Sequence, residues 1–244
     1  MCQASYQGDK MDTVNFARSR ALNNIPQKKL LDTLANIENS QDDLQTKSVK
    51  LTAINRYAES NIPMEYWTLK MERDFIGDHR LLAKYNEYVK DLKHSYTSGT
   101  SFCLGGKHGL GKTMTTTCIL KKACQKGYSC LYTTLSDIVT VLTSAGGEDK
   151  FNARRELVLV DFLVIDEFDS RFMPSDNAAD LYARTLESVF RTRASNNQPT
   201  LMCTNSPNVV NSFHGPLKDS IDSLMSGYVE MFPVMGKDIR KEEK

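Results

Sequence analysis

The sequence lacks the features of a membrane or secreted protein. No stretch of its 244 residues approaches the roughly 20 consecutive apolar residues that a membrane-spanning helix needs. The first residues, MCQASYQGDKMDTVNF, contain no apolar segment of the kind that a secretory signal requires. We therefore expect a cytoplasmic protein with no membrane partner.

Metal-binding patterns of cysteine and histidine are also missing. The 6 cysteines form no Cys-x-x-Cys pair, and no histidine lies at zinc-ligand spacing from them. Most of them lie in apolar runs such as SFCL and TLMCTN, where a thiol behaves as a small buried hydrophobe. The sequence predicts reduced, buried cysteines and no zinc site.

A strong charge of one sign is absent too. The chain has 31 lysines and arginines against 30 aspartates and glutamates, which gives a formal net charge of +1. This balance produces no overall field that would draw the protein onto DNA or an anionic membrane. Any contact with nucleic acid must therefore come from a local patch.

Apolar residues at helical spacing characterise the first part of the chain. In QKKLLDTLANIENS, the residues Leu30, Leu31, Leu34 and Ile37 recur at the intervals of one helix face. We predict that residues 1–68 form a small helical region and a linker. Two interpretations stay open, since such a helix is either an amphipathic helix with a solvated back or part of a module that binds a partner protein.

Strands alternate with helices from about residue 69 onward. The apolar strand TSFCLGG precedes a helix that Gly127 would end, and YSCLYTT precedes a helix that Ser136 would cap. The run LVLVDFLVIDE is typical of a strand buried on both faces, and PTLMCTN follows a long helix with an apolar stripe. This alternation predicts an α/β domain over residues 69–244, with a parallel sheet between layers of helices.

A glycine-rich segment follows the first of these strands. In GGKHGLGKT, Gly106, Gly111, Lys112 and Thr113 match the P-loop pattern G-x-x-x-x-G-K-[ST] between a strand and a helix. The glycines let backbone N–H groups close around phosphate oxygens, whereas a turn that binds nothing is the alternative. Lys112 would reach the β- and γ-phosphates, and the Thr113 hydroxyl would bind Mg²⁺. The predicted nucleotide-binding residues are Gly106, Lys107, His108, Gly109, Leu110, Gly111, Lys112, Thr113, Met114 and Asp166.

Polar side chains end two later strands. FLVIDE ends in Asp166 and Glu167, and TLMCTN is followed by Asn205. Open α/β sheets bind ligands at the carboxyl ends of their strands, so we expect Asp166 to hold Mg²⁺ through water, together with Thr113. As catalytic residues, Glu167 would orient or deprotonate the attacking water, and Asn205 would hydrogen-bond that water or the γ-phosphate. An acidic surface turn and an asparagine turn are the alternatives.

The order of these motifs resembles that of a known family. The P-loop, LVIDE, a long helix and PTLMCTN follow one another as in AAA+ ATPases. The flanking text RYAESNIPMEYW, DFIGD and GYVEMFPVMGKDIR is similar to that of the DnaC/DnaI-type helicase loaders and the IstB transposition helpers. The resemblance covers roughly residues 55–240. It implies an ATPase domain that assembles side by side around single-stranded DNA, and an N-terminal region that docks on a hexameric helicase.

The resemblance also implies roles for single residues. It places Gly106, Lys112 and Thr113 in the Walker A motif, Asp166 and Glu167 in Walker B, and Asn205 at sensor 1. Arg193 matches a basic position ahead of the sensor strand, and Arg240 matches a late arginine that can approach the γ-phosphate. A helix-end arginine and a solvated tail arginine are the respective alternatives.

The sequence departs from the family at the arginine finger. The helix after sensor 1 usually carries arginines in the family, but SIDSLMSG has Ser220 and Leu224 there, and Lys218 is the one lysine or arginine between Asn205 and Gly236. An arginine finger contributes roughly 10³ to 10⁵ in rate where it operates. Either Lys218 or Arg193 replaces it, or hydrolysis is slow and nucleotide binding is itself the signal. The sequence also leaves little or no room for a helical lid.

These observations predict an ATP-binding DNA replication protein that loads a replicative hexameric helicase onto single-stranded DNA. ATP and Mg²⁺ would be its cofactors, ATP hydrolysis would be weak, and copies of the chain would assemble with the helicase and DNA. The alternative is an IstB-type transposition helper that acts with a transposase. A nucleotide kinase is disfavoured by the LVIDE and TN arrangement.

Overall fold

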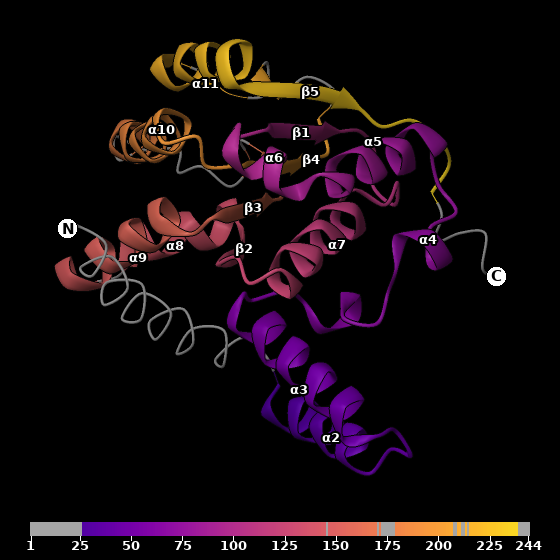
Figure 1. Cartoon of the computed structure of the whole chain (residues 1–244). Helices are drawn as coiled ribbons and strands as arrows, with labels where there is room; N and C mark the ends of the chain where they lie inside the picture. Colours follow the sequence, from indigo (N-terminus) through magenta and orange to yellow (C-terminus); the bar gives the residue numbers. More distant parts are fainter. Residues whose placement is uncertain are drawn as a thin grey trace, which may run out of the picture.

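The computed structural model describes residues 26–144, 146–169, 171, 179–206, 209–210, 213 and 215–238. Helices and strands alternate along this part of the chain (Figure 1). The N-terminal elements are α2 (Gln27–Glu38), α3 (Leu44–Glu59), the 3-10 helix η1 (Met64–Tyr66), α4 (Met71–Asp74), α5 (His79–Lys90) and α6 (Leu92–Thr97). The elements of the sheet region are β1 (Ser101–Gly105), α7 (Lys112–Gln125), β2 (Cys130–Thr134), α8 (Leu135–Ser144), α9 (Gly147–Leu159), β3 (Phe162–Asp166), α10 (Ala179–Ser195), β4 (Thr200–Thr204), α11 (Gly215–Tyr228) and β5 (Val229–Pro233).

The five strands form one parallel sheet in the order β2-β3-β4-β1-β5. Leu104 of β1 lies opposite Cys203 of β4, and Ile165 of β3 lies opposite Met202. Because the strands are parallel, the P-loop after β1 and the polar residues after β3 and β4 meet at the same edge of the sheet.

Successive side chains of each strand alternate between two hydrophobic clusters, one on each face of the sheet. Phe102 and Leu104 of β1 pack with α7 and α5 on one face, whereas Cys103 packs with α8, α10 and α11 on the other. All five residues of β3 are buried, as predicted for a central strand. The expected α/β fold with a parallel sheet between helix layers is therefore confirmed.

Helix ends follow the local chemistry of the sequence, with two corrections. Gly127 has a left-handed φ of 89° just after α7, as predicted for a helix-ending glycine. The cap of α8 is Thr134, whose hydroxyl accepts a hydrogen bond from the Asp137 backbone at 3.0 Å, so the prediction of Ser136 was wrong. The strand predicted from Leu157 begins only at Phe162, because the first apolar residues of that run end α9. A short apolar run does not distinguish a buried helix end from a strand.

The N-terminal helices α2 and α3 lie side by side and extend away from the sheet (Figure 1). Asp43 caps α3 by accepting a hydrogen bond from the Thr46 backbone at 2.9 Å. Leu30 is buried, but Leu31 is 64% exposed, so the apolar stripe predicted for α2 does not include Leu31. Ile62 at the end of this region joins the same hydrophobic cluster as α7. The boundary between residues 68 and 69 remains a prediction.

Candidate nucleotide site

The P-loop connects β1 to α7 through glycines in left-handed backbone conformations. Gly106 has a φ of 155° and Gly111 a φ of 81°. A Cβ atom at position 106 would lie 2.5 Å from the carbonyl oxygen of Val234, and one at position 111 would lie 2.4 Å from the ring of Phe75. The loop therefore lies between the segment that precedes α5 and the segment that follows β5, and both approaches require glycine.

Lys112 is buried beneath this loop. Its ammonium group donates hydrogen bonds to the backbone oxygens of Gly106 at 2.7 Å and Lys107 at 2.6 Å. It also donates to Oδ1 of Asn205 at 3.1 Å, and Asn205 directly follows β4, the strand beside β1. The structure thus brings together the lysine and the asparagine that the sequence predicts for the site. A cation held by neutral oxygens at a helix N-terminus provides positive potential for phosphate groups.

Thr113 and Asp166 are in direct contact. The Thr113 hydroxyl donates a hydrogen bond to Oδ2 of Asp166 at 2.8 Å. The Tyr132 hydroxyl donates to the same oxygen at 2.9 Å, and the backbone N–H of Glu167 donates to Oδ1 at 2.8 Å. The Asp166 carboxylate is consequently held by three donors at the end of β3.

Glu167 has an unusual backbone conformation. Its φ is 51°, which is left-handed and costs a residue other than glycine about 1–2 kcal/mol. The next backbone N–H, of Phe168, donates to the Cys203 oxygen at 2.8 Å and anchors the chain after the turn. The Glu167 side chain is exposed, whereas that of Asp166 is buried. Two adjacent carboxylates thereby occupy different environments, and their separate roles remain a prediction.

The remaining predicted P-loop residues fall into two groups. The side chains of Lys107 and His108 are exposed, while those of Leu110 and Met114 are buried in the hydrophobic core. The last two can therefore face a nucleotide only through their backbone amides, which is how a P-loop holds phosphate. Their role in binding remains a prediction.

Two tyrosines near the metal-site residues were not predicted from the sequence. Burial raises the pKa of Tyr66 to about 12, and the pKa of Tyr132 is raised further, first by burial and then by the charge of Asp166. Both hydroxyls stay protonated at neutral pH and can donate. The apolar-flanked position of Tyr132 in CLYTT predicted a strand residue, but nothing local indicated its contact with Asp166.

The donor set fits Mg²⁺. Thr113 gives its single hydroxyl proton to Asp166, so its oxygen keeps one lone pair for a cation beside the hydrogen bond with Tyr66. Oδ1 of Asp166 accepts one hydrogen bond from the described residues, from Glu167, and keeps capacity for a metal-bound water. Mg²⁺ favours such hard oxygen ligands and retains several waters. No cluster of three or more histidine, cysteine or acidic side chains that could hold another metal occurs among the described residues.

Arg193 is remote from this site. It is 1% exposed, and it donates to the backbone oxygens of Val160 at 2.8 Å and Pro199 at 2.7 Å, near the amino ends of β3 and β4. Of the alternatives for the arginine finger, Arg193 is therefore disfavoured, because a buried side chain cannot reach a neighbouring subunit. On α11, Leu224 is buried and Lys218 is exposed. Arg240 lies outside the described residues.

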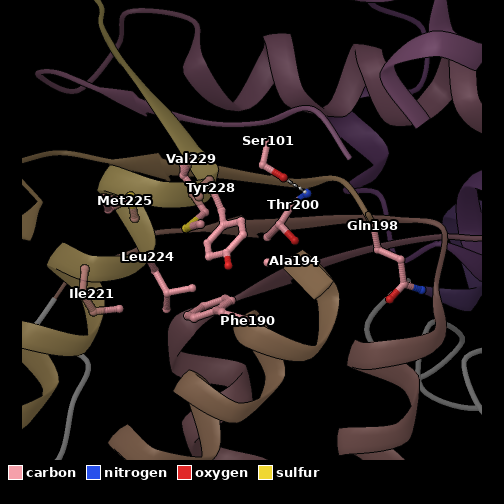
Figure 2. Close-up of a pocket in the computed structure, with 11 residues that line it drawn as sticks. Ser101, Phe190, Ala194, Gln198, Thr200, Ile221, Leu224, Met225, Tyr228 and Val229 are labelled. Carbon is pink, nitrogen blue, oxygen red and sulfur yellow. Dashed lines mark hydrogen bonds between the residues drawn. The ribbon is translucent and has the colours of Figure 1, made fainter. Parts of the chain in front are cut away.

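A small pocket lies on the opposite edge of the sheet, between α10, α11 and the amino ends of β1, β4 and β5 (Figure 2). Phe190, Leu224 and Tyr228 point into it, and the Thr200 backbone donates to Ser101 Oγ at 2.9 Å beside it. The lining is mostly apolar and contains none of the predicted nucleotide-binding residues. This pocket does not belong to the nucleotide site.

The fold and the site together define the class of protein. A parallel sheet with a P-loop after β1, paired carboxylates after β3 and an asparagine after β4 is the arrangement of an AAA+ P-loop domain. The model of the IstB-like ATP binding protein family matches residues 77–198, half of the chain. The chain belongs to this family of ATP-binding proteins. No curated protein matches it.

Solved structures share the fold at low sequence identity. The DnaC helicase loader is 18% identical with a TM-score of 0.56, over 71% of this chain and 100% of that one. DnaI is 15% identical with a TM-score of 0.57, over 72% and 93%. The replication initiator DnaA bound to AMPPCP and single-stranded DNA is 17% identical with a TM-score of 0.57, over 75% and 55%. The chain thus spans about half the length of that DnaA structure, and at these identities the likeness shows the fold alone.

None of the helices in the described part of the chain is long and apolar enough to cross a membrane. The five described cysteines are free thiols and are buried. Burial raises the pKa of Cys103 to about 12, so this thiol is protonated and unreactive at neutral pH.

Proposed function

We propose that the protein loads a replicative hexameric helicase onto single-stranded DNA in the cytoplasm, and that its nucleotide state controls assembly and release. One observation carries this proposal: the N-terminal helices are attached directly to α7, the helix that begins at the P-loop lysine. Arg56 of α3 donates to the Cys124 backbone at 2.7 Å, and Gln125 donates to the Tyr57 hydroxyl at 2.6 Å. Both contacts lie at the far end of α7 from the P-loop.

The length and rigidity of α7 make it suited to transmit a change at the phosphates. It has 14 residues, so it spans roughly 20 Å at 1.5 Å per residue. Its N-terminal residue is buried Lys112, and most of its remaining side chains are buried against the sheet and α3. A displacement of Lys112 by bound phosphate would therefore move the base of α3.

The α2–α3 pair offers apolar surface to a partner. Leu31 is 64% exposed, Leu44 is 86% exposed and Val49 is 65% exposed, although all three belong to helices. Leu31 lies on α2, and Leu44 and Val49 lie on α3, so both helices present apolar side chains that a partner protein could cover. This supports the interpretation of residues 1–68 as a helicase-binding region.

The nucleotide site would hold ATP and Mg²⁺. The P-loop amides and Lys112 would bind the phosphates, and Thr113 with Asp166 would hold the metal. Bound Mg²⁺ neutralises charge that develops on the phosphates. Glu167 would orient or deprotonate the attacking water, and Asn205, already bonded to Lys112, would stand beside the terminal phosphate.

Hydrolysis is proposed to be weak in the isolated chain. Arg193 is buried, Leu224 packs in the core, and Lys218 is the one exposed base on the described part of α11. Without an arginine finger, the rate of ATP hydrolysis would be lower by a factor of roughly 10³ to 10⁵. Nucleotide binding would then act as a timing signal for assembly on DNA, with copies of the chain side by side.

Co-purification with the cognate hexameric helicase tests the proposed partner. We expect a complex with the wild-type chain, and loss of it in a Leu31→Glu/Val49→Glu double variant, because charge would be buried in the contact. Phe151→Glu is the matched control, since Phe151 is 64% exposed on α9, away from the N-terminal helices. Absence of any complex, with or without ATP, would refute helicase loading.

ATP hydrolysis with and without single-stranded DNA and helicase tests the proposed chemistry. Wild type and Glu167→Gln are compared under each condition. A slow rate that is abolished in the variant supports the assignment of Glu167. A robust rate would mean that another group, with Lys218 as the first candidate, replaces the arginine finger.

The second candidate function is an IstB-type transposition helper. The match of residues 77–198 to the IstB-like family brings this alternative forward, but it lies in the ATPase part that both functions share and does not separate them. The two functions differ in what the N-terminal helices bind. A transposase gene beside the coding gene, and co-purification with that transposase, would favour this alternative over helicase loading.

A further inference from the structure

The Tyr132 hydroxyl contacts the carboxylate of the proposed metal site. It donates to Oδ2 of Asp166 at 2.9 Å, and Tyr132 belongs to none of the P-loop, Walker B or sensor motifs. We propose that Tyr132 is a positioning residue that fixes the Asp166 carboxylate for the nucleotide-bound Mg²⁺. This inference rests on the proposed ATP and Mg²⁺ binding.

The hydrogen bonds around Asp166 show what the tyrosine contributes. A carboxylate offers about four acceptor directions, two on each oxygen. Thr113 and Tyr132 occupy both directions of Oδ2, and the Glu167 backbone occupies one of Oδ1. The direction that remains on Oδ1 is then the one available to a water ligand. Without the Tyr132 proton, one direction of Oδ2 becomes free as well, and the carboxylate has fewer restraints on its rotation.

The position of Tyr132 is itself set from two sides. On one side its strand pairs with β3, where Tyr132 lies opposite Val164. On the other side, the Tyr132 backbone N–H donates to the Ser60 backbone oxygen at 2.8 Å. The Asn61 side-chain amide donates to the Tyr132 backbone oxygen at 3.1 Å. Edge strand β2 is thus held between the sheet and the end of α3. These contacts fix the backbone from which the Tyr132 side chain extends, and the side chain itself is buried.

A purely structural role makes a different prediction. A buried tyrosine hydroxyl needs an acceptor, and Asp166 would satisfy that need whatever the carboxylate does. Loss of the hydroxyl would then lower stability alone. If Tyr132 positions Asp166, its loss changes the dependence of nucleotide binding on Mg²⁺ and leaves Mg²⁺-free binding unchanged.

The chain contains a matched control for this experiment. Tyr96 donates to Oδ1 of Asp161 at 2.8 Å, so it too makes a tyrosine–aspartate hydrogen bond. Asp161 directly precedes β3, whereas Asp166 is the last residue of this strand, so the two bonds lie at opposite edges of the sheet. Tyr96→Phe therefore removes the same chemical contact away from the nucleotide site.

Binding of a fluorescent ATP analogue is measured for wild type, Tyr132→Phe and Tyr96→Phe, in EDTA and across a Mg²⁺ titration. For Tyr132→Phe we expect the Mg²⁺ concentration at half-saturation to rise about three- to tenfold, in line with the net loss of one typical hydrogen bond. Its binding in EDTA should be unchanged. Tyr96→Phe should match the wild type in both conditions, and the melting temperature of each variant is recorded.

The outcomes separate this inference from the proposed function. Mg²⁺ dependence of Tyr132→Phe equal to that of wild type would overturn the positioning role. A lower melting temperature with equally weakened binding in EDTA and Mg²⁺ would overturn it as well, because that pattern is structural. If wild type binds the analogue without any dependence on Mg²⁺, the proposed metal site itself fails.

Discussion

Replacement of Arg193 by methionine should destabilise the protein strongly without altering its nucleotide site. The guanidinium donates to the backbone oxygens of Leu157 and Val160 at 2.8 Å and of Pro199 at 2.7 Å, and to the Thr200 hydroxyl at 2.9 Å. Burial lowers the pKa of Arg193 to about 9, so the group still carries its charge at neutral pH. The side chain joins the end of α9 to the amino ends of β3 and β4.

The expected loss follows from the acceptors that methionine cannot satisfy. The buried carbonyl oxygens of Leu157 and Val160 lose their donor, and each costs about 1–3 kcal/mol when left unpaired, whereas the Pro199 oxygen keeps the Leu163 backbone N–H at 3.2 Å. Methionine fills part of the volume and removes the cost of burying a charge, which offsets some of this loss. We expect the free energy of unfolding to fall by about 2–4 kcal/mol.

Urea denaturation of Arg193→Met measures this change, with Arg191→Met as the control. Arg191 lies on the same helix, but its side chain is 48% exposed and pairs with Glu187 at 2.7 Å. Its replacement should change stability by no more than about 0.5 kcal/mol. At a temperature where Arg193→Met is folded, nucleotide binding should equal that of wild type. Equal stability of the two variants, with ATP hydrolysis lost only in Arg193→Met, would refute the structural role. It would indicate instead that Arg193 acts in the nucleotide site.

Three further predictions concern the loop, the turn after β3 and the start of α5. Glu167→Gly should be more stable than Glu167→Gln by about 0.5–1 kcal/mol in chemical denaturation, because glycine removes the strain of a φ of 51°. Gly111→Ala should lose about 2 kcal/mol and bind nucleotide more weakly, because its Cβ would meet an aromatic ring at 2.4 Å, whereas Gly146→Ala, with open space around it, should be neutral. The pKa of Asp78 is lowered to about 2, chiefly by a hydrogen bond from the Arg80 side chain, so its contribution to stability is complete above about pH 4 and is lost as the pH falls through 2. Urea midpoints between pH 5 and pH 2 should therefore fall less for Asp78→Asn than for wild type.

Much of the nucleotide site could be predicted because its parts obey local or periodic rules. The P-loop pattern is contiguous, and its glycines are required by backbone geometry within a few residues. Thr113 and Asp166 are 53 residues apart, yet their contact follows from the rule that parallel strands place their carboxyl ends at one edge. Asn205 reaches Lys112 for the same reason, although the direct bond between them was not expected.

The contacts that were missed or misassigned join residues that no local rule relates. Tyr132 meets Asp166 because β2 and β3 pair in one register, which places the tyrosine and the carboxylate on the same side of the sheet. Arg193 matches a family pattern near the sensor strand, but in the structure it is buried and hydrogen-bonds backbone oxygens of α9 and of the segments before β3 and β4. The residues from Leu157 are apolar enough for either a strand or a buried helix end, and only packing chose the helix.

The sequence alone determined that this chain has a parallel α/β sheet, a P-loop and two carboxylates after a buried strand, because each of these depends on spacing within one segment. The tertiary structure decided which side chains support them. Hydrogen-bond partners such as Tyr132, and the removal of Arg193 from any role at the site, depend on strand register and on burial. These arise only when segments distant in the chain pack together, and a single sequence carries no local signal of that packing.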